Sequence, residues 1–334
     1  MNVLVDRHHA GLYHSMQLLA RRLGWTLYTP IGHDWWDEWY WSFGRSTYND
    51  DRLALQYLMA AQGPDGEYPD WPINFVTLEQ ARAMPWEYVI ATLQDNQTGF
   101  AKFAREIGAR FVVQVGNTGQ NIDWDLDPLV LSSSEMPLLG EGVVYHQEFD
   151  SSGLFGYREP FTKRTKAVRC FVHLLHETAC YPFWQEFRAL LPDWEVQRYG
   201  HAPTFEDPSY VENAKPTMRI AVLMAASAWG WHDKPHGDGF GHVLHGWAAI
   251  GRPLIGHASH YRGKMGEPFW RDMETCIDLD LHSVQEAAEI VRSISPDEHR
   301  KMCRAIRATF DELVDYDREA ESILALLSRE LVAA

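Results

Sequence analysis

The chain has 334 residues, of which 46% are hydrophobic and 23% are charged. This is the composition of an ordered globular protein, and the length predicts two domains of about 150 residues rather than one core. The formal net charge of −16 repels polyanions over the whole surface, so nucleic-acid binding would require a local basic groove.

The sequence indicates neither a membrane-spanning helix nor a secretory signal. The longest uncharged runs, such as residues 220–231, are shorter than the roughly 20 apolar residues of a membrane-spanning helix. Met1 leads directly into an apolar strand pattern without the basic region and cleavage site of a secretory signal. We therefore expect a cytoplasmic protein, in the host cytoplasm if the source is viral. The four cysteines lack CxxC spacing, which predicts buried thiols.

The first half of the chain alternates apolar β-rich runs with helical periodicity, the pattern of a parallel sheet covered by helices. The predicted elements are strands 2–6, 25–28, 88–93, 110–115 and 128–132, and helices 12–23 and 98–107. An aromatic insertion separates the second strand from the third. Together these elements predict a doubly wound first domain at residues 1–155.

A connector at residues 151–166, rich in Gly, Ser and basic residues, precedes a second series of the same kind. The predicted elements are strands 168–175, 195–199, 228–232, 253–256 and 276–279, and helices 183–191, 218–227, 241–250 and 284–293. They predict a second α/β domain at residues 165–310. Residues 311–334 are predicted to be a C-terminal helix that packs back on the first domain.

Three glycines, Gly237, Gly239 and Gly241, lie between the strand that ends near His232 and the helix that begins near His242. Glycine permits positive φ and lets the backbone approach an anion, which a helix N-terminus attracts. Lys234 adds a positive charge just before the turn. A tight turn that binds nothing would have the same glycines.

This segment resembles the donor-binding signature E-G-F-G-x-x-x-x-E-A-x-A-x-G-x-P-V-I of GT-B glycosyltransferases of the glycogen-synthase and sucrose-synthase type. Asp238, Gly239, Phe240 and Gly241 match its start, and residues 251–255 match its end. The resemblance implies two Rossmann-like doubly wound domains that face each other across a cleft. It also implies transfer of a sugar from a nucleoside diphosphate sugar, here a UDP-sugar, to an acceptor hydroxyl with retention and without a metal or cofactor.

The match departs from the family pattern at two acidic positions, and the first is Asp238, which is one methylene shorter than the family's Glu. Gly246 occupies the position of the second carboxylate, which usually binds the ribose, so His245 beside it is a candidate substitute. The family's Arg and Lys pair is also missing, which leaves Lys234, Arg198 or Arg262 to neutralise the diphosphate. Lys234 is placed in the catalytic set, and the full donor-binding set is His232, Gly237, Asp238, Gly239, Phe240, Gly241, His242, His245 and Arg198.

The resemblance places the acceptor on the first domain, at loops that follow its strands. His8, His9 and Gly11 follow the first strand, and His9 is the candidate general base, although a capping or merely exposed histidine fits the same position. Asp95 follows the third strand as a candidate catalytic carboxylate, with a helix N-cap as its alternative. Asn117 follows the fourth as a candidate acceptor contact.

The remaining candidates are aromatic residues and histidines. Trp35 and Trp36, in an unusually aromatic stretch, are candidates for a platform that stacks on the acceptor, with core packing as an equal alternative. The sixteen histidines include two local groups, His8, His9 and His14 in one and His232, His236, His242 and His245 in the other. Neither group has zinc-site spacing, so no metal is expected.

Three other functions stay open on the sequence. The opening DRHHAGLYHS and the aromatic stretch also resemble phage glycosyltransferases, some of which modify 5-hydroxymethylpyrimidines in DNA. A DNA acceptor would need a basic lining on the first domain. A nucleotide-sugar epimerase shares the two-domain fold and would convert the donor without an acceptor. A non-catalytic nucleotide-binding protein would bind the diphosphate and release no sugar.

Overall fold

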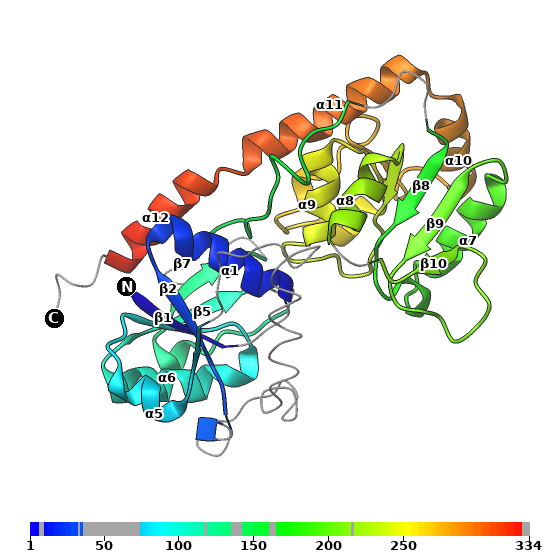
Figure 1. Ribbon diagram of the computed structural model, residues 1–334. Coiled ribbons are helices and arrows are strands. Elements are labelled where there is room, and N and C mark those ends of the chain that lie inside the picture. Colours follow the sequence, from blue (N-terminus) through cyan, green and yellow to red (C-terminus); the bar gives the residue numbers. More distant parts are fainter. Residues whose placement is uncertain are drawn as a thin grey trace. The chain divides into compact units, whose positions relative to one another are not determined.

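The computed structural model describes residues 1–6, 10–32, 34–35, 74–116, 119–134, 142–159, 165–214 and 217–328. The chain forms two compact units (Figure 1). Unit 1 comprises Met1–Phe149 with Asp315–Ala334, and unit 2 comprises Asp150–Val314. Among the described residues, no helix combines the length and apolarity that crossing a membrane requires.

Unit 1 contains a parallel sheet in the order β3-β2-β1-β4-β5-β6-β7. Its strands are β1 (Asn2–Val5), β2 (Thr26–Pro30), β3 (Asn74–Val76), β4 (Tyr88–Ala91), β5 (Arg110–Val115), β6 (Leu129–Ser132) and β7 (Gly142–Val144). Its helices are α1 (Ala10–Leu23), α5 (Leu78–Ala83), α6 (Gln97–Ile107) and α12 (Tyr316–Ser328), with 3-10 turns η1 (Gln94–Asn96) and η2 (Trp124–Leu126).

Helix α1 shows how the sequence pattern builds this unit. Leu12, Met16, Leu19 and Leu23 recur at helical spacing, and all four are buried against the sheet. Gly24 ends the helix with a φ of +65°, a left-handed conformation that glycine adopts at little cost. Helix α12 lies beside α1 and contributes to the same core, so the C-terminal segment belongs to unit 1 (Figure 1).

Unit 2 contains a parallel sheet in the order β10-β9-β8-β11-β12-β13. Its strands are β8 (Ala167–Cys170), β9 (Glu195–Tyr199), β10 (Tyr210–Glu212), β11 (Trp229–Trp231), β12 (Leu254–Gly256) and β13 (Cys276–Asp278). Its helices are α7 (Tyr181–Leu190), α8 (Thr217–Ala225), α9 (His242–Ile250), α10 (Val284–Ser293) and α11 (Pro296–Leu313), with 3-10 turns η3 (Leu175–Glu177), η4 (Ala258–Tyr261) and η5 (Glu267–Phe269).

The predicted elements are largely confirmed to within two residues, except for one strand that is predicted five residues too long. Residues 110–115, 195–199 and 284–293 have the predicted bounds. The strand predicted at 168–175 ends at Cys170, because the chain turns away from the sheet and Leu175–Glu177 forms η3. The four cysteines are buried free thiols, as predicted.

Each sheet has a point at which the direction of its strand order reverses. In unit 1 this point lies between β1 and β4, and in unit 2 it lies between β8 and β11. Loops that leave neighbouring strands toward opposite sides open a crevice there, at the carboxyl ends of the strands, where open α/β sheets bind their ligands. A ligand site is therefore expected at each of the two reversal points.

Candidate functional site

The loop after β11 holds the remaining carboxylate of the glycine-rich signature. Asp238 accepts a hydrogen bond from His232 Nε2 at 3.0 Å and forms an ion pair with Lys234. Burial alone would raise the pKa of Asp238, but His232 and the charge of Lys234 hold that pKa well below its usual range. His232 is buried, whereas the side chain of Lys234 is 45% exposed. The loop thus joins a fixed carboxylate to an accessible cation.

Two of the three glycines have a reason within the protein itself. Gly237 has a φ of +61°, and a Cβ there would lie 2.3 Å from the carbonyl oxygen of His260. Gly241 has a φ of +67° and is the N-cap of α9. The close approach of η4 therefore requires a glycine at position 237. This requirement accounts for Gly237 without the predicted role of making room for a phosphate.

The start of α9 is suited to an anion. Because the N-cap Gly241 has no side chain, it cannot supply the usual acceptor for the N–H groups of the first turn. Gly241, His242 and Val243 are partly exposed. The first turn of α9 and the positive end of its dipole thus meet solvent beside Lys234, at the reversal point of the sheet.

His245 lies in the core of unit 2. It is fully buried, stacks on Phe240 with a centroid distance of 4.0 Å, and packs edge-on against Phe269. The predicted donor contact of His245 is therefore wrong, because its ring serves to anchor α9. Phe240 is buried as well, so it supports the turn from beneath.

Gly246 explains why the second carboxylate of the signature is missing. A Cβ at this position would lie 3.2 Å from the ring of Phe155, which is itself buried. A side chain at this position would therefore begin in tight contact with an aromatic ring of the same unit. The site therefore has one carboxylate from this helix segment, not two.

Arg198 is fully buried at the end of β9. It forms an ion pair with Asp207, donates to the carbonyl of His201, and lies 5.0 Å from the ring centre of Tyr210. The prediction that Arg198 neutralises a diphosphate is wrong, because its charge is already paired inside the fold. This leaves Lys234 and Arg262 as the predicted cations that reach solvent.

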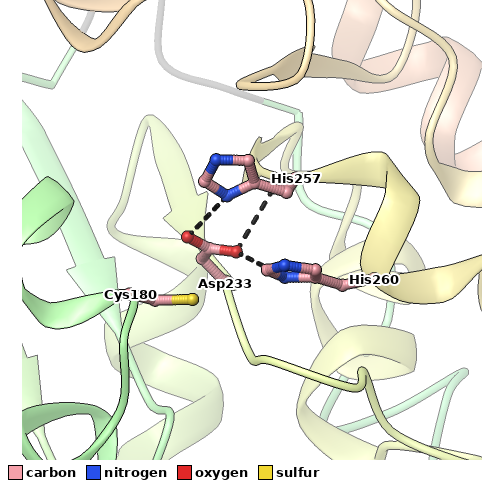
Figure 2. Close-up of side chains that lie close together, drawn as sticks. All are labelled: Cys180, Asp233, His257 and His260. Atoms are coloured by element: carbon pink, nitrogen blue, oxygen red, sulfur yellow. Dashed lines mark hydrogen bonds and ion pairs between the residues drawn. The ribbon is translucent and has the colours of Figure 1, made fainter.

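A second group of polar side chains meets beside the same loop (Figure 2). Asp233 is fully buried, and its carboxylate accepts hydrogen bonds from His257 Nδ1 at 2.9 Å and His260 Nδ1 at 3.1 Å. Burial would raise the pKa of Asp233, but the two imidazoles hold it well below its usual range. Burial opposes the charged form of His257, yet Asp233 raises the pKa of His257 above its usual value. The thiol of Cys180 points toward this carboxylate.

At the reversal point of unit 1, Asp6 follows β1 and is fully buried. Its carboxylate accepts hydrogen bonds from Thr92 N, Thr92 Oγ1, Leu93 N and Asn96 Nδ2, at distances from 2.5 to 3.1 Å. Burial raises the pKa of Asp6 to about 6, against the lowering effect of these donors. Asp6 thereby fixes the loop after β4, which carries Asp95.

The predicted acceptor residues of unit 1 have different outcomes. Asp95 is exposed within η1 and is not a helix N-cap, because Asn96 takes that position for α6. Gly11 belongs to the first turn of α1 rather than to the loop before it. Trp35 is buried, donates to the carbonyl of Val76 and packs edge-on against Phe103, so of its two predicted roles it has core packing and not a place in a stacking platform. His8, His9, Trp36 and Asn117 lie outside the described residues.

Comparison with known proteins finds similarity in structure but not in sequence. No protein-family model and no curated protein sequence matches the chain. Many solved structures match the chain, several of them almost throughout, and three of these are crystal structures from different organisms. The crystal structure of Anabaena HepE in complex with UDP-glucose has a TM-score of 0.66 and 12% sequence identity. The match covers 98% of this chain and 100% of the HepE chain. A Rickettsia africae glycosyltransferase has a TM-score of 0.66, 11% identity, and coverage of 100% and 99%. A UDP-forming α,α-trehalose-phosphate synthase from Burkholderia xenovorans has a TM-score of 0.58, 12% identity, and coverage of 100% and 99%.

The chain has the GT-B fold. The α/β architecture with two Rossmann-like domains, expected from the resemblance, is thereby confirmed. At these identities the likeness fixes the fold, and the chemistry has to be argued from the side chains of this chain.

Within this GT-B fold, two sets of polar residues at the reversal points are not predicted from the sequence. Asp6 directly follows a strand and was treated as part of it. Asp233, His257 and His260 follow two strands that are neighbours in the sheet, and that adjacency appears only once the strand order is known. The available signal was the rule that polar residues after parallel strands share one edge.

Proposed function

We propose that the chain transfers a glycosyl unit from a nucleoside diphosphate sugar, with a UDP-sugar as the donor, to an acceptor hydroxyl. Unit 2 binds the donor and unit 1 binds the acceptor. The proposal is supported by the GT-B fold and by structural neighbours whose crystals contain UDP or UDP-glucose. UDP and UDP-glucose are ligands of those proteins, and a UDP-sugar as the donor of this chain is part of the proposal.

The observation that carries the proposal is the start of α9 at the reversal point of the second sheet. In the proposal, the N–H groups that follow Gly241 and the ammonium of Lys234 receive the two phosphates. Lys234 now pairs with Asp238, and a diphosphate with more charge would draw it away. Asp238, still held by His232, is then left to accept a hydrogen bond from a hydroxyl of the sugar.

The reaction breaks the bond between the anomeric carbon and the diphosphate and forms one between that carbon and the acceptor oxygen. The physical task is to stabilise the departing diphosphate and the sugar cation, which helix N-termini and a lysine do without a metal. The acceptor proton passes to the leaving diphosphate or to a base from unit 1, for which Asp95 and His9 are the candidates. We propose that no cofactor takes part.

The acceptor is a saccharide or another small molecule with a free hydroxyl. The net charge of −16 opposes the approach of DNA, so a hydroxymethylated base is the less favoured acceptor. All three acceptor types belong in the assay as separate arms.

The test is to incubate the protein with a panel of UDP-, GDP- and ADP-sugars and to measure free nucleoside diphosphate, with and without each acceptor type. We expect release that depends on an acceptor. Conversion of the donor to its epimer without an acceptor would replace the transferase proposal with an epimerase, and binding without any release would replace it with a nucleotide-binding role.

A pair of lysine variants locates the site. Lys234→Ala should lower kcat/KM by at least roughly tenfold, approaching the 10²–10³ that loss of one preorganised donor costs. Lys166→Ala is the matched control, because Lys166 also pairs with an aspartate in unit 2 and is 57% exposed. Equal activities of the two variants would remove the start of α9 from the mechanism.

A further inference from the structure

We propose that Cys180, Asp233, His257 and His260 bind one divalent transition-metal ion, with Zn²⁺ as the natural occupant. The four side chains offer one sulfur, one oxygen and two nitrogen atoms, and these atoms all lie within 4.8 Å of one another. This inference rests on unit 2 alone and does not depend on the transferase proposal.

The four residues come from three loops at the carboxyl edge of the second sheet. Cys180 immediately precedes α7 in the loop after β8, Asp233 follows β11, and His257 and His260 follow β12. Because β8, β11 and β12 are neighbours in the sheet, these loops meet at the reversal point (Figure 2). An ion at this place would cross-link three loops that the sheet alone only brings near.

The geometry is close to that of a tetrahedral site. Zinc takes nitrogen and oxygen ligands at about 2.0 Å and sulfur at about 2.3 Å, so ligand atoms in a tetrahedron lie roughly 3.3–3.5 Å apart. The Nδ1 atoms of His257 and His260 lie 2.9 and 3.1 Å from the oxygens of Asp233, and the farthest pair of ligand atoms lies within 4.8 Å. Shifts of about 1 Å or less would bring these ligand atoms to tetrahedral separations, and side-chain rotations alone cover such shifts.

The charges also balance at a buried place. Cys180 and Asp233 are 2% and 0% exposed, and a free charge there is costly. On metal binding the Cys180 thiol releases its proton to solvent, and each imidazole keeps one proton on Nε2 while Nδ1 binds. One thiolate, one carboxylate, two neutral imidazoles and a divalent cation then sum to zero.

The donor set selects the metal and the role. Thiolate and imidazole favour Zn²⁺ and Co²⁺ over Mg²⁺ and Ca²⁺, which prefer oxygen ligands. Four protein ligands close the coordination sphere, which is the arrangement of a structural zinc rather than of a catalytic one. The ion would stabilise unit 2 and hold the loop that carries Asp238, without entering the sugar-transfer step.

The test uses the full chain with any affinity tag removed, stripped of metal by a chelator and then titrated with Co²⁺ and Zn²⁺. We expect one equivalent of tightly bound Co²⁺ with the intense visible bands of a tetrahedral site and a thiolate-to-cobalt charge-transfer band. Zn²⁺ should displace the cobalt and raise Tm, because it binds the folded state.

Cys180→Ser should abolish the charge-transfer band, and His260→Gln, at a partly exposed position, should weaken Zn²⁺ binding at least tenfold. His282→Ala is the matched control, since His282 pairs with Asp272 at 3.0 Å outside the cluster and should keep full binding. An octahedral cobalt spectrum, the absence of a one-equivalent site, or unchanged binding in both cluster variants would overturn the proposal.

Discussion

Replacement of Gly237 by alanine tests whether this glycine is required by the fold or by the ligand. Its φ of +61° costs an alanine about 1–2 kcal/mol, and the new Cβ would also lie 2.3 Å from the His260 carbonyl oxygen. Since that oxygen belongs to the backbone, η4 has to move. We expect Gly237→Ala to lower the free energy of unfolding by about 3 kcal/mol or more, near the upper range for a single substitution.

Gly108 provides the matched control. Its φ of +73° is similar, but a Cβ there would have no neighbour within 4 Å. Gly108→Ala should therefore show only the conformational cost of about 1–2 kcal/mol. Urea unfolding gives both values, and hydrogen exchange should show lost protection around His260 only in Gly237→Ala. Equal costs in the two variants, together with a selective loss of UDP binding by Gly237→Ala, would refute this reasoning.

Three further predictions concern buried positions. Asp6→Asn should cost about 1–3 kcal/mol in thermal unfolding, because either orientation of the new amide leaves at least one buried N–H of the β4 loop without an acceptor. Burial raises the pKa of Asp6 from 3.8 to about 6. The stability of the wild type relative to this variant should therefore be greatest below pH 4 and should fall by up to about 3 kcal/mol as the pH rises through 6. A stability difference that does not change with pH would contradict the buried carboxyl. Gly246→Glu, offered as a restored family carboxylate, should instead collide with Phe155, lower Tm and give no gain in nucleotide affinity by calorimetry.

The sequence predicts the central elements of the fold because each of them carries its own signal. Residues 110–115 and 195–199 are apolar runs bounded by turns, and their predicted bounds agree with β5 and β9. The strands β3, β7 and β10 have three residues each and exist through pairing with a longer neighbour. All three lie at sheet edges and are not fully buried, so they lack the apolar run that marks the equally short β11, β12 and β13.

The site could be predicted in part. The position of the glycine-rich turn and of Asp238 follows from the signature, and the loop between β11 and α9 holds it as expected. The prediction was wrong about which individual side chains are exposed to solvent. His245 and Arg198 are both charged or polar types that the sequence assigns to solvent, but each is buried by partners from distant segments, Phe269 for one and Asp207 for the other.

The cluster around Asp233 could not be predicted by spacing. Zinc motifs in sequence rely on ligands close together in the chain, whereas Cys180, Asp233 and His257 come from loops that only the strand order brings together. A derived sheet order, combined with a search for ligand-type residues directly after each strand, would find such a set.

A crystal structure of the chain with UDP tests the central claim most directly. We predict that the diphosphate lies at the start of α9, within hydrogen-bonding distance of the N–H groups after Gly241, with the Lys234 ammonium turned from Asp238 to a phosphate oxygen. A diphosphate bound away from the loop between β11 and α9, with the pair of Lys234 and Asp238 intact, would contradict it.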